Sequence, residues 1–130
     1  MSVVSRNRAQ RIADRIHEEI SEMLIFDIKD PRLSGVSVTD VTVDRELAYA
    51  DIYVSSIQGS ESAENILTGF QRASGFLRSE LARRIDLRTF PQLRFRWDPT
   101  PENTEKIEKL LDSLSQQGQP TSEDDLPGNE

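Results

Sequence analysis

Two neighbouring stretches of alternating apolar and polar residues constrain this fold more than any other feature. The alternation runs through residues 36–43 and again through 48–55, with a predicted turn at 44–47 between them. A period of two is typical of β-strands that bury one face, so these stretches predict an antiparallel hairpin. The first alternation slips by one residue near Thr39 and Asp40, which predicts a β-bulge there. Tyr49 and Tyr53 fall on the unburied face.

Helical periodicity flanks this hairpin on both sides. Apolar residues at three- and four-residue spacing predict a helix over residues 5–29, with Ser5 as its cap and Asp30-Pro31 as its end. A second helical pattern runs from Ile66 to Ile85, and residues 89–98 alternate again as a third strand. This order predicts a two-layer α+β domain, in which helices cover one face of a three-stranded sheet.

A glycine lies in the middle of the second helical pattern, at Gly75 after Ala73-Ser74. Glycine in a helix interior costs about 1 kcal/mol relative to alanine. One interpretation is a tolerated glycine at a close helix contact. The other is a break or kink that exposes backbone N–H groups to a ligand. Arg72 and Arg78 flank the site, and a kink between them presents free N–H groups and guanidinium groups together, which suits phosphate.

The C-terminal part of the chain has a different character. Thr100-Pro101-Glu102 is a helix start, and a short amphipathic helix follows with apolar residues at Ile107, Leu110, Leu111 and Leu114. From Ser115 the residues are polar and acidic and have almost nothing to bury, so we expect a disordered acidic tail. The expected domains are therefore 1–114 and 115–130.

Composition excludes several kinds of chemistry. The chain has no cysteine and one histidine, His17, so it offers no disulfide, no thiolate and no site that needs two imidazoles. It has no GxxxxGK phosphate loop and no recognisable carboxylate pair. We expect no catalytic residue, metal, cofactor or small-molecule substrate. No apolar run approaches 18 residues and no signal-peptide hydrophobic region occurs, so we expect a soluble cytoplasmic monomer with no membrane contact.

The net charge of −7 conceals two arginine-rich islands. Residues 1–16 hold four arginines against Asp14, and residues 72–97 hold seven arginines against Glu80 and Asp86; the remaining segments are acidic. Arginine has a planar fork that matches phosphate and a face that stacks on bases. The islands, with the interrupted helix, predict an RNA-binding surface made of Arg6, Arg8, Arg11, Arg15, Arg72, Ala73, Ser74, Gly75, Arg78, Arg83, Arg84, Arg88, Arg94 and Arg96.

An alternative is a protein-interaction module that uses the acidic surface and the C-terminal helix. In that case the arginines pair with carboxylates within the fold, as Arg15 and Glu19 can at a spacing of i,i+4. The positions of the arginines discriminate between the two hypotheses.

Several short stretches, taken together in their order and spacing, resemble the ribosome-binding factor A family. They lie between about Arg6 and Leu111, at 11–16, 50–55, 73–78, 87–95 and 107–111. The resemblance implies a type II KH-like fold of the order α-β-β-α-kink-α-β, in which Ala-x-Gly replaces the GxxG loop that clamps RNA. Only one of those two glycines is present, which favours contact with folded rRNA through shape and phosphate.

The resemblance also implies a function. It implies binding to the free small (30S) ribosomal subunit, contact with 16S rRNA, and a non-catalytic role in late subunit maturation, pre-rRNA processing and cold adaptation. It does not extend over the Ser115–Glu130 tail.

Overall fold

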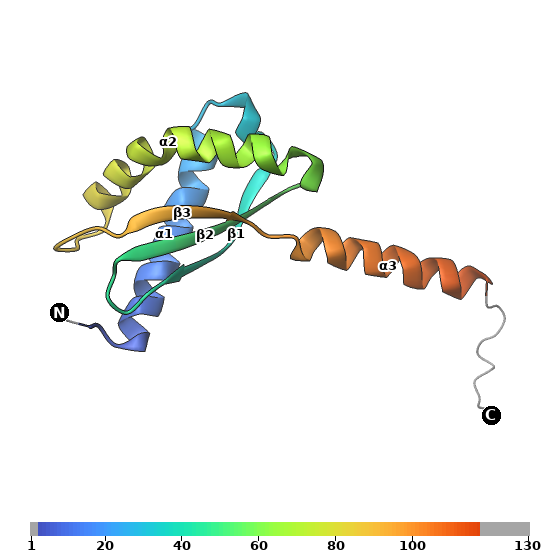
Figure 1. The fold of residues 1–130 in the computed structure, drawn as a ribbon, viewed down its shortest axis with the longest axis horizontal. Coiled ribbons are helices and arrows are strands. Elements are labelled where there is room, and N and C mark those ends of the chain that lie inside the picture. Colours follow the sequence, from blue (N-terminus) through green and yellow to red (C-terminus); the bar gives the residue numbers. More distant parts are fainter. Residues whose placement is uncertain (1–2, 118–130) are drawn as a thin grey trace. The chain divides into compact units, whose positions relative to one another are not determined.

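The computed structural model describes residues 3–117, and its contacts divide the chain into two units with the boundary between Asp98 and Pro99 (Figure 1). Among the described residues, the first unit holds two long helices and three strands, and the second holds one helix. The elements are α1 (Arg6–Phe26), η1 (Pro31–Leu33), β1 (Val36–Val43), β2 (Tyr49–Ser56), η2 (Ser60–Ser62), α2 (Ala63–Arg84), β3 (Gln92–Trp97) and α3 (Thr100–Gln117).

The sheet has the order β1-β2-β3 and is mixed. β1 pairs antiparallel with β2, which confirms the predicted hairpin, and its register shifts between Val38 and Asp40, which confirms the bulge. The extra residue is Thr39, whose hydroxyl donates to the Tyr53 carbonyl oxygen at 3.3 Å. β3 pairs in parallel with β2, with Tyr49 opposite Gln92, so α2 forms the crossover between these two strands.

One face of the sheet is covered by α1 and α2, and this layer is the core of the first unit (Figure 1). Phe70 of α2 is fully buried and stacks on Phe95 of β3, with 4.7 Å between the ring centroids. The predicted α+β class and the three-stranded sheet with helices on one face are confirmed. The largest fully buried side chains include Ile16, Ile20, Met23, Ile52, Ile66, Leu77 and Leu81.

Helix α1 begins as predicted and ends earlier than predicted. The Ser5 hydroxyl accepts a hydrogen bond from the Arg8 N–H at 3.1 Å, which confirms the cap. At the other end, the N–H groups of Asp27 and Ile28 both donate to the Met23 carbonyl oxygen, at 2.8 and 2.9 Å, and this closes the helix at Phe26. Asp30-Pro31 does not end α1 directly, because Asp30 caps the separate turn η1.

The predicted break in the second helix is wrong, because residues 63–84 form one continuous α-helix. Phe70 and Leu77 are fully buried on either side of Gly75, so the apolar face holds the helix together across it. The glycine is not at a close contact either, since a Cβ on Gly75 would meet no atom within 4 Å. The close approach is at Gly69, where a Cβ would lie 3.1 Å from Leu33 Cδ2 of η1.

The second unit, as far as it is described, is the helix α3. It begins at Thr100 with Glu102 in its first turn, as predicted, and continues to Gln117, past the expected start of the tail at Ser115. The rest of the predicted tail, 118–130, lies outside the described residues. Within residues 3–117 no helix is long and apolar enough to cross a membrane, and no group of three or more His, Cys, Asp or Glu side chains could hold a metal ion.

Candidate nucleic-acid interface

The first turn of α1 is fixed beside the turn between β1 and β2. The Val4 N–H donates to the Arg45 carbonyl oxygen at 2.8 Å, and Arg45 Nε donates to the Val4 carbonyl oxygen at 2.9 Å. Ser5, the helix cap, follows directly. This reciprocal contact therefore determines where the arginines at the start of α1 lie. Arg45 was not among the predicted site residues, since an arginine in a turn carries no recognisable signal.

Members of the two arginine islands meet at a cavity of about 740 Å³ between the start of α1, the β1–β2 turn and the α2–β3 connection. Arg8 comes from the first island and Arg88 from the second, and both line this cavity. Ser5 and Thr89 contribute hydroxyl groups, and Glu46 contributes one carboxylate. The balance of two guanidinium groups against one carboxylate suits a phosphate group, whose oxygens accept from guanidinium and hydroxyl donors.

Several arginines of the two islands have no hydrogen-bond acceptor or ion-pair partner among the described residues. Arg8 and Arg11 are exposed and lie one helical turn apart, on one side of α1; Arg15 follows on the same side. Among residues 3–117, no carboxylate or carbonyl oxygen accepts a hydrogen bond from the guanidinium groups of Arg6, Arg8, Arg11 or Arg88. We name these four residues the unpaired arginines. Each one keeps its full set of donors for a ligand.

Arg15 and Arg84 instead join α1 to the end of α2. Glu19 accepts from Arg15 Nη2 at 3.2 Å and from Arg84 Nη1 at 3.1 Å, and Asp27 accepts from Arg84 Nη2 at 3.3 Å. The hydrogen bond that Arg84 donates to Glu19 raises the pKa of the Arg84 guanidinium, and the bond to Asp27 adds to this effect. Arg15 also donates to the Arg84 carbonyl oxygen at 3.1 Å. The contacts of these two residues are those of a link between helices.

Arg78 and Arg83 also bind acceptor groups of the protein itself. Arg78 Nε donates to the Pro91 carbonyl oxygen at 3.1 Å, and Arg78 Nη2 donates to the Phe90 carbonyl oxygen at 2.6 Å. This fork holds the segment before β3 against α2. Arg83 pairs with Glu80 of the same helix at 2.8 Å and remains largely exposed.

Arg94 and Arg96 lie on the sheet face opposite α1 and α2, where both bind Asp51. Arg94 donates through Nε and Nη2, at 2.7 and 3.1 Å, and Arg96 donates through Nε at 3.1 Å. These bonds, the one from Arg94 above all, hold the pKa of the Asp51 carboxyl below its usual range. The Arg94 guanidinium also lies 4.1 Å from the centroid of the Tyr49 ring, so it occupies the ring face on which a base could stack.

The residues predicted around a kink lie on the continuous helix α2. Arg72 and Gly75 are exposed, and Ala73 and Ser74 are half-buried. The positive charge of Arg72 acts on Asp30 and helps to lower the pKa of that carboxyl, so we do not count Arg72 among the unpaired arginines. The Ser74 hydroxyl donates to the Gln71 carbonyl oxygen at 2.8 Å. Because the helix is unbroken, its backbone N–H groups are used in the helix itself and cannot bind phosphate. The free N–H groups expected at Ala73–Gly75 are therefore absent from the described structure.

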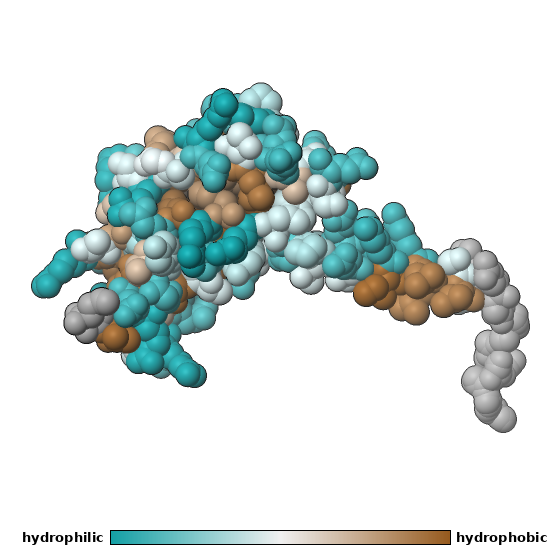
Figure 2. All heavy atoms as spheres, viewed as in Figure 1, coloured by the Kyte–Doolittle hydropathy of each residue, from teal (hydrophilic) through white to brown (hydrophobic). Residues whose placement is uncertain are grey.

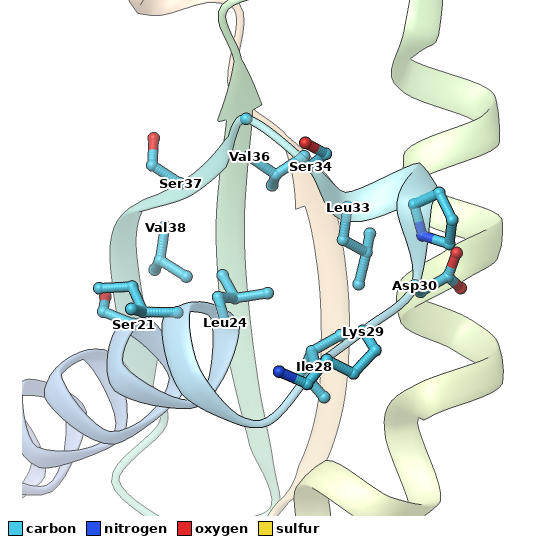
Figure 3. A pocket seen from close by; sticks show the side chains of 13 residues that line it. Ser21, Leu24, Ile28, Lys29, Asp30, Leu33, Ser34, Val36, Ser37 and Val38 are labelled. Carbon is cyan, nitrogen blue, oxygen red and sulfur yellow. The ribbon is translucent and has the colours of Figure 1, made fainter.

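A second cavity, of about 560 Å³, lies between the end of α1, η1 and β1 (Figure 3). Its wall is largely apolar, with Leu24, Ile28 and Val36 among its lining residues. The one carboxylate that lines it, Asp30, is bound by Arg32 at 2.7 Å, and this contact lowers the pKa of Asp30. This cavity does not have the lining of a phosphate site, because its wall is largely apolar and none of the predicted arginines lines it.

A mixed three-stranded sheet, with α1 and α2 on one face and the order α-β-β-α-β, defines a KH-like α+β protein. The sequence profile of the family described as ribosome-binding factor A matches residues 8–111. The chain belongs to this family. Relatives named ribosome-binding factor A include one from Alcanivorax borkumensis, 44% identical over 95% of this chain and 91% of its own length. Another, from Aromatoleum aromaticum, is 35% identical over 92% and 94%.

Structures of the same family resemble this one. The crystal structure of ribosome-binding factor A from Thermus thermophilus has a TM-score of 0.60 and 26% identity, over 68% of this chain and 93% of that one. A homology model of the Thermus thermophilus factor, fitted into a cryo-EM map of a complex of ribosome-binding factor A with the 30S subunit, has a TM-score of 0.52 and 27% identity, over 71% of this chain and 92% of that one.

Proposed function

We propose that this chain is a non-catalytic ribosome-assembly factor that binds the free small (30S) subunit through 16S rRNA and assists late maturation, including pre-rRNA processing. Its family membership supports this proposal, as do the name of its relatives and the 30S complex of the Thermus thermophilus factor. The observation that carries the RNA contact is the set of unpaired arginines, two members of which, Arg8 and Arg88, line one cavity.

The division between paired and unpaired arginines decides which of them we assign to RNA. A guanidinium that already binds carboxylates has part of its donors occupied and its charge offset, as in Arg84 and Arg94. An unpaired guanidinium offers five donors and its full charge to a phosphate. We therefore assign the rRNA contact to Arg6, Arg8, Arg11 and Arg88. The acidic segments elsewhere repel unrelated nucleic acid.

Two matched triple variants test this assignment. The first, Arg8→Gln/Arg11→Gln/Arg88→Gln, removes three unpaired charges; the second, Arg83→Gln/Arg94→Gln/Arg96→Gln, removes three paired ones. The affinity of each full-length protein for free 30S subunits is measured by sedimentation over a range of salt concentrations. Each lost phosphate contact lowers the salt slope by roughly 0.7 to 0.9. The first triple is therefore expected to lower the slope by about two to three, and the second to change it little.

Equal effects of the two triples would refute the assignment, because binding would then depend on net charge alone. The same sedimentation assay compares free 30S subunits with whole ribosomes, and we expect selective binding to the free subunit. A wild-type protein that pellets with neither particle would refute the proposed function itself.

A further inference from the structure

Helix α3 carries an apolar face that is exposed along its whole length. Ile107, Leu110, Leu111 and Leu114 are 57%, 60%, 58% and 54% exposed. Their spacing of i, i+3, i+4 and i+7 places them on one side of the helix, and Figure 2 shows this brown stripe along α3. Single exposed apolar residues are ordinary, but a contiguous group of four large ones marks an interaction site.

The charge on this part of the chain is opposite to that of the arginine-rich start of α1. Described α3 holds four acidic residues against Lys106 and Lys109, and the sequence from 99 to 130 holds eight acidic residues against the same two lysines. Like charges repel, so this unit is disfavoured next to the phosphates of RNA or of an anionic lipid surface. The partner that complements it carries apolar side chains and positive charge, which describes a basic protein.

The length of the stripe argues against a second copy of the same helix as the partner. The four apolar residues span only about two helical turns, whereas stable coiled coils sustain their apolar repeat over roughly three to four heptads. A short helix gains most from a groove that already exists on its partner. Helix-in-groove recognition uses anchors at i, i+3, i+4 and i+7, which are the positions found here.

We propose that α3 docks its apolar face into a groove on a basic protein of the small ribosomal subunit. This proposal rests on the proposed function, because a ribosomal subunit presents two kinds of surface, rRNA and protein, and the acidic helix is suited to the second. The chain then holds the subunit at two places of opposite chemistry. Arginines contact phosphate, and α3 contacts protein. Two linked contacts raise the overall affinity above that of either one.

A pair of α3 variants tests the proposal in the full-length protein. Leu110→Gln/Leu111→Gln removes half of the apolar face and keeps good helix formers. The control is Glu105→Gln/Lys109→Gln, which removes an exposed pair 4.0 Å apart on the opposite side and leaves the net charge unchanged. Affinity is measured for intact 30S subunits and for protein-free 16S rRNA. We expect the leucine variant to lose at least about tenfold in affinity for the subunit.

The same variant is expected to bind protein-free 16S rRNA within about twofold of wild type, and the control to match wild type on both probes. Unchanged binding of the leucine variant to the subunit would overturn the proposal, and so would an equal loss on bare rRNA. If the arginine triple lowers subunit binding and the leucine variant does not, this inference fails and the proposed function stands. If the wild-type protein binds no subunit, both this inference and the proposed function are refuted.

A photocrosslink supplies a second readout. A benzophenone amino acid in place of Leu114 is irradiated on the 30S complex, and the same residue in place of Lys109 serves as the control. We expect Leu114 to crosslink to a ribosomal protein more strongly than Lys109 does. Crosslinks to rRNA alone would overturn the proposal. A wild-type dimer in sedimentation equilibrium that the leucine variant abolishes would also overturn it, in favour of a second copy.

Discussion

The substitution Gly75→Ala is expected to stabilise this protein. Gly75 lies in the interior of α2 on its exposed side, and an added Cβ would meet no atom within 4 Å. Replacing glycine by alanine in such a helix raises the free energy of unfolding by about 0.5–1 kcal/mol. The reason is that alanine lowers the conformational entropy of the unfolded chain, while the folded chain accommodates the methyl group without a clash. The gain follows from the continuity of α2 at Ala73–Gly75.

A matched control is available in the same helix. At Gly69 the same substitution would place a Cβ 3.1 Å from Leu33 Cδ2 and 3.5 Å from Arg32 Cβ, on the side that packs against η1. The helical gain is then offset by displacement of η1, so Gly69→Ala is expected to be neutral or destabilising. The difference between the two variants isolates this packing from helix propensity.

Urea unfolding and thermal melting measure both variants. In a domain of this size 1 kcal/mol corresponds to roughly 4–8 °C, so Gly75→Ala should raise Tm by about 2–8 °C. A lower Tm would show that the chain is not helical at Gly75 in solution and would refute the reasoning. A higher Tm with lost affinity for the 30S subunit would show that a ligand approaches the backbone here, which would also refute it.

Two further predictions concern Arg78 and Asp51, whose side chains are hydrogen-bonded within the fold. Arg78→Gln should destabilise the fold by about 1–3 kcal/mol in urea unfolding, because the Phe90 and Pro91 carbonyl oxygens lose their donor; unchanged stability would show that this contact is dispensable. Asp51 has a lowered pKa in the folded protein because Arg94 and Arg96 bind it. The unfolded chain therefore takes up the proton first as the pH falls below about 5. The stability difference between wild type and Asp51→Asn should be full near neutral pH and shrink as the pH falls through the folded pKa. A difference that stays constant down to about pH 3 would contradict this account.

The fold was largely predictable because its signals are local. Period-two alternation in 36–55 identified the hairpin, and the one-residue slip identified the bulge at Thr39. The Ser5 cap depends on residues three apart, and a spacing that short is visible in the sequence. The prediction failed at Gly75, where the local preference of one glycine was outweighed by the burial of Phe70 and Leu77 against the sheet.

The candidate site was predictable only as a list of arginines. Their pairing depends on residues far apart in the chain, such as Arg84 with Glu19 and Arg94 with Asp51. Pairs within one helix, such as Arg15 with Glu19 and Arg83 with Glu80, have a spacing that the sequence reveals. The meeting of Arg8 with Arg88 depends on how the start of α1 contacts the β1–β2 turn, and no periodic pattern encodes that contact.

The parallel pairing of β3 with β2 has a consequence for a chain that is synthesised from its N-terminus. The antiparallel hairpin forms from neighbours in sequence, but β3 reaches its place only after the whole of α2 has emerged. Until then one edge of β2 has unpaired backbone groups, and Phe70 lacks the ring on which it stacks. A nascent or truncated chain that stops before Gln92 therefore exposes an unpaired edge of β2, and aggregation of this protein would begin at that edge.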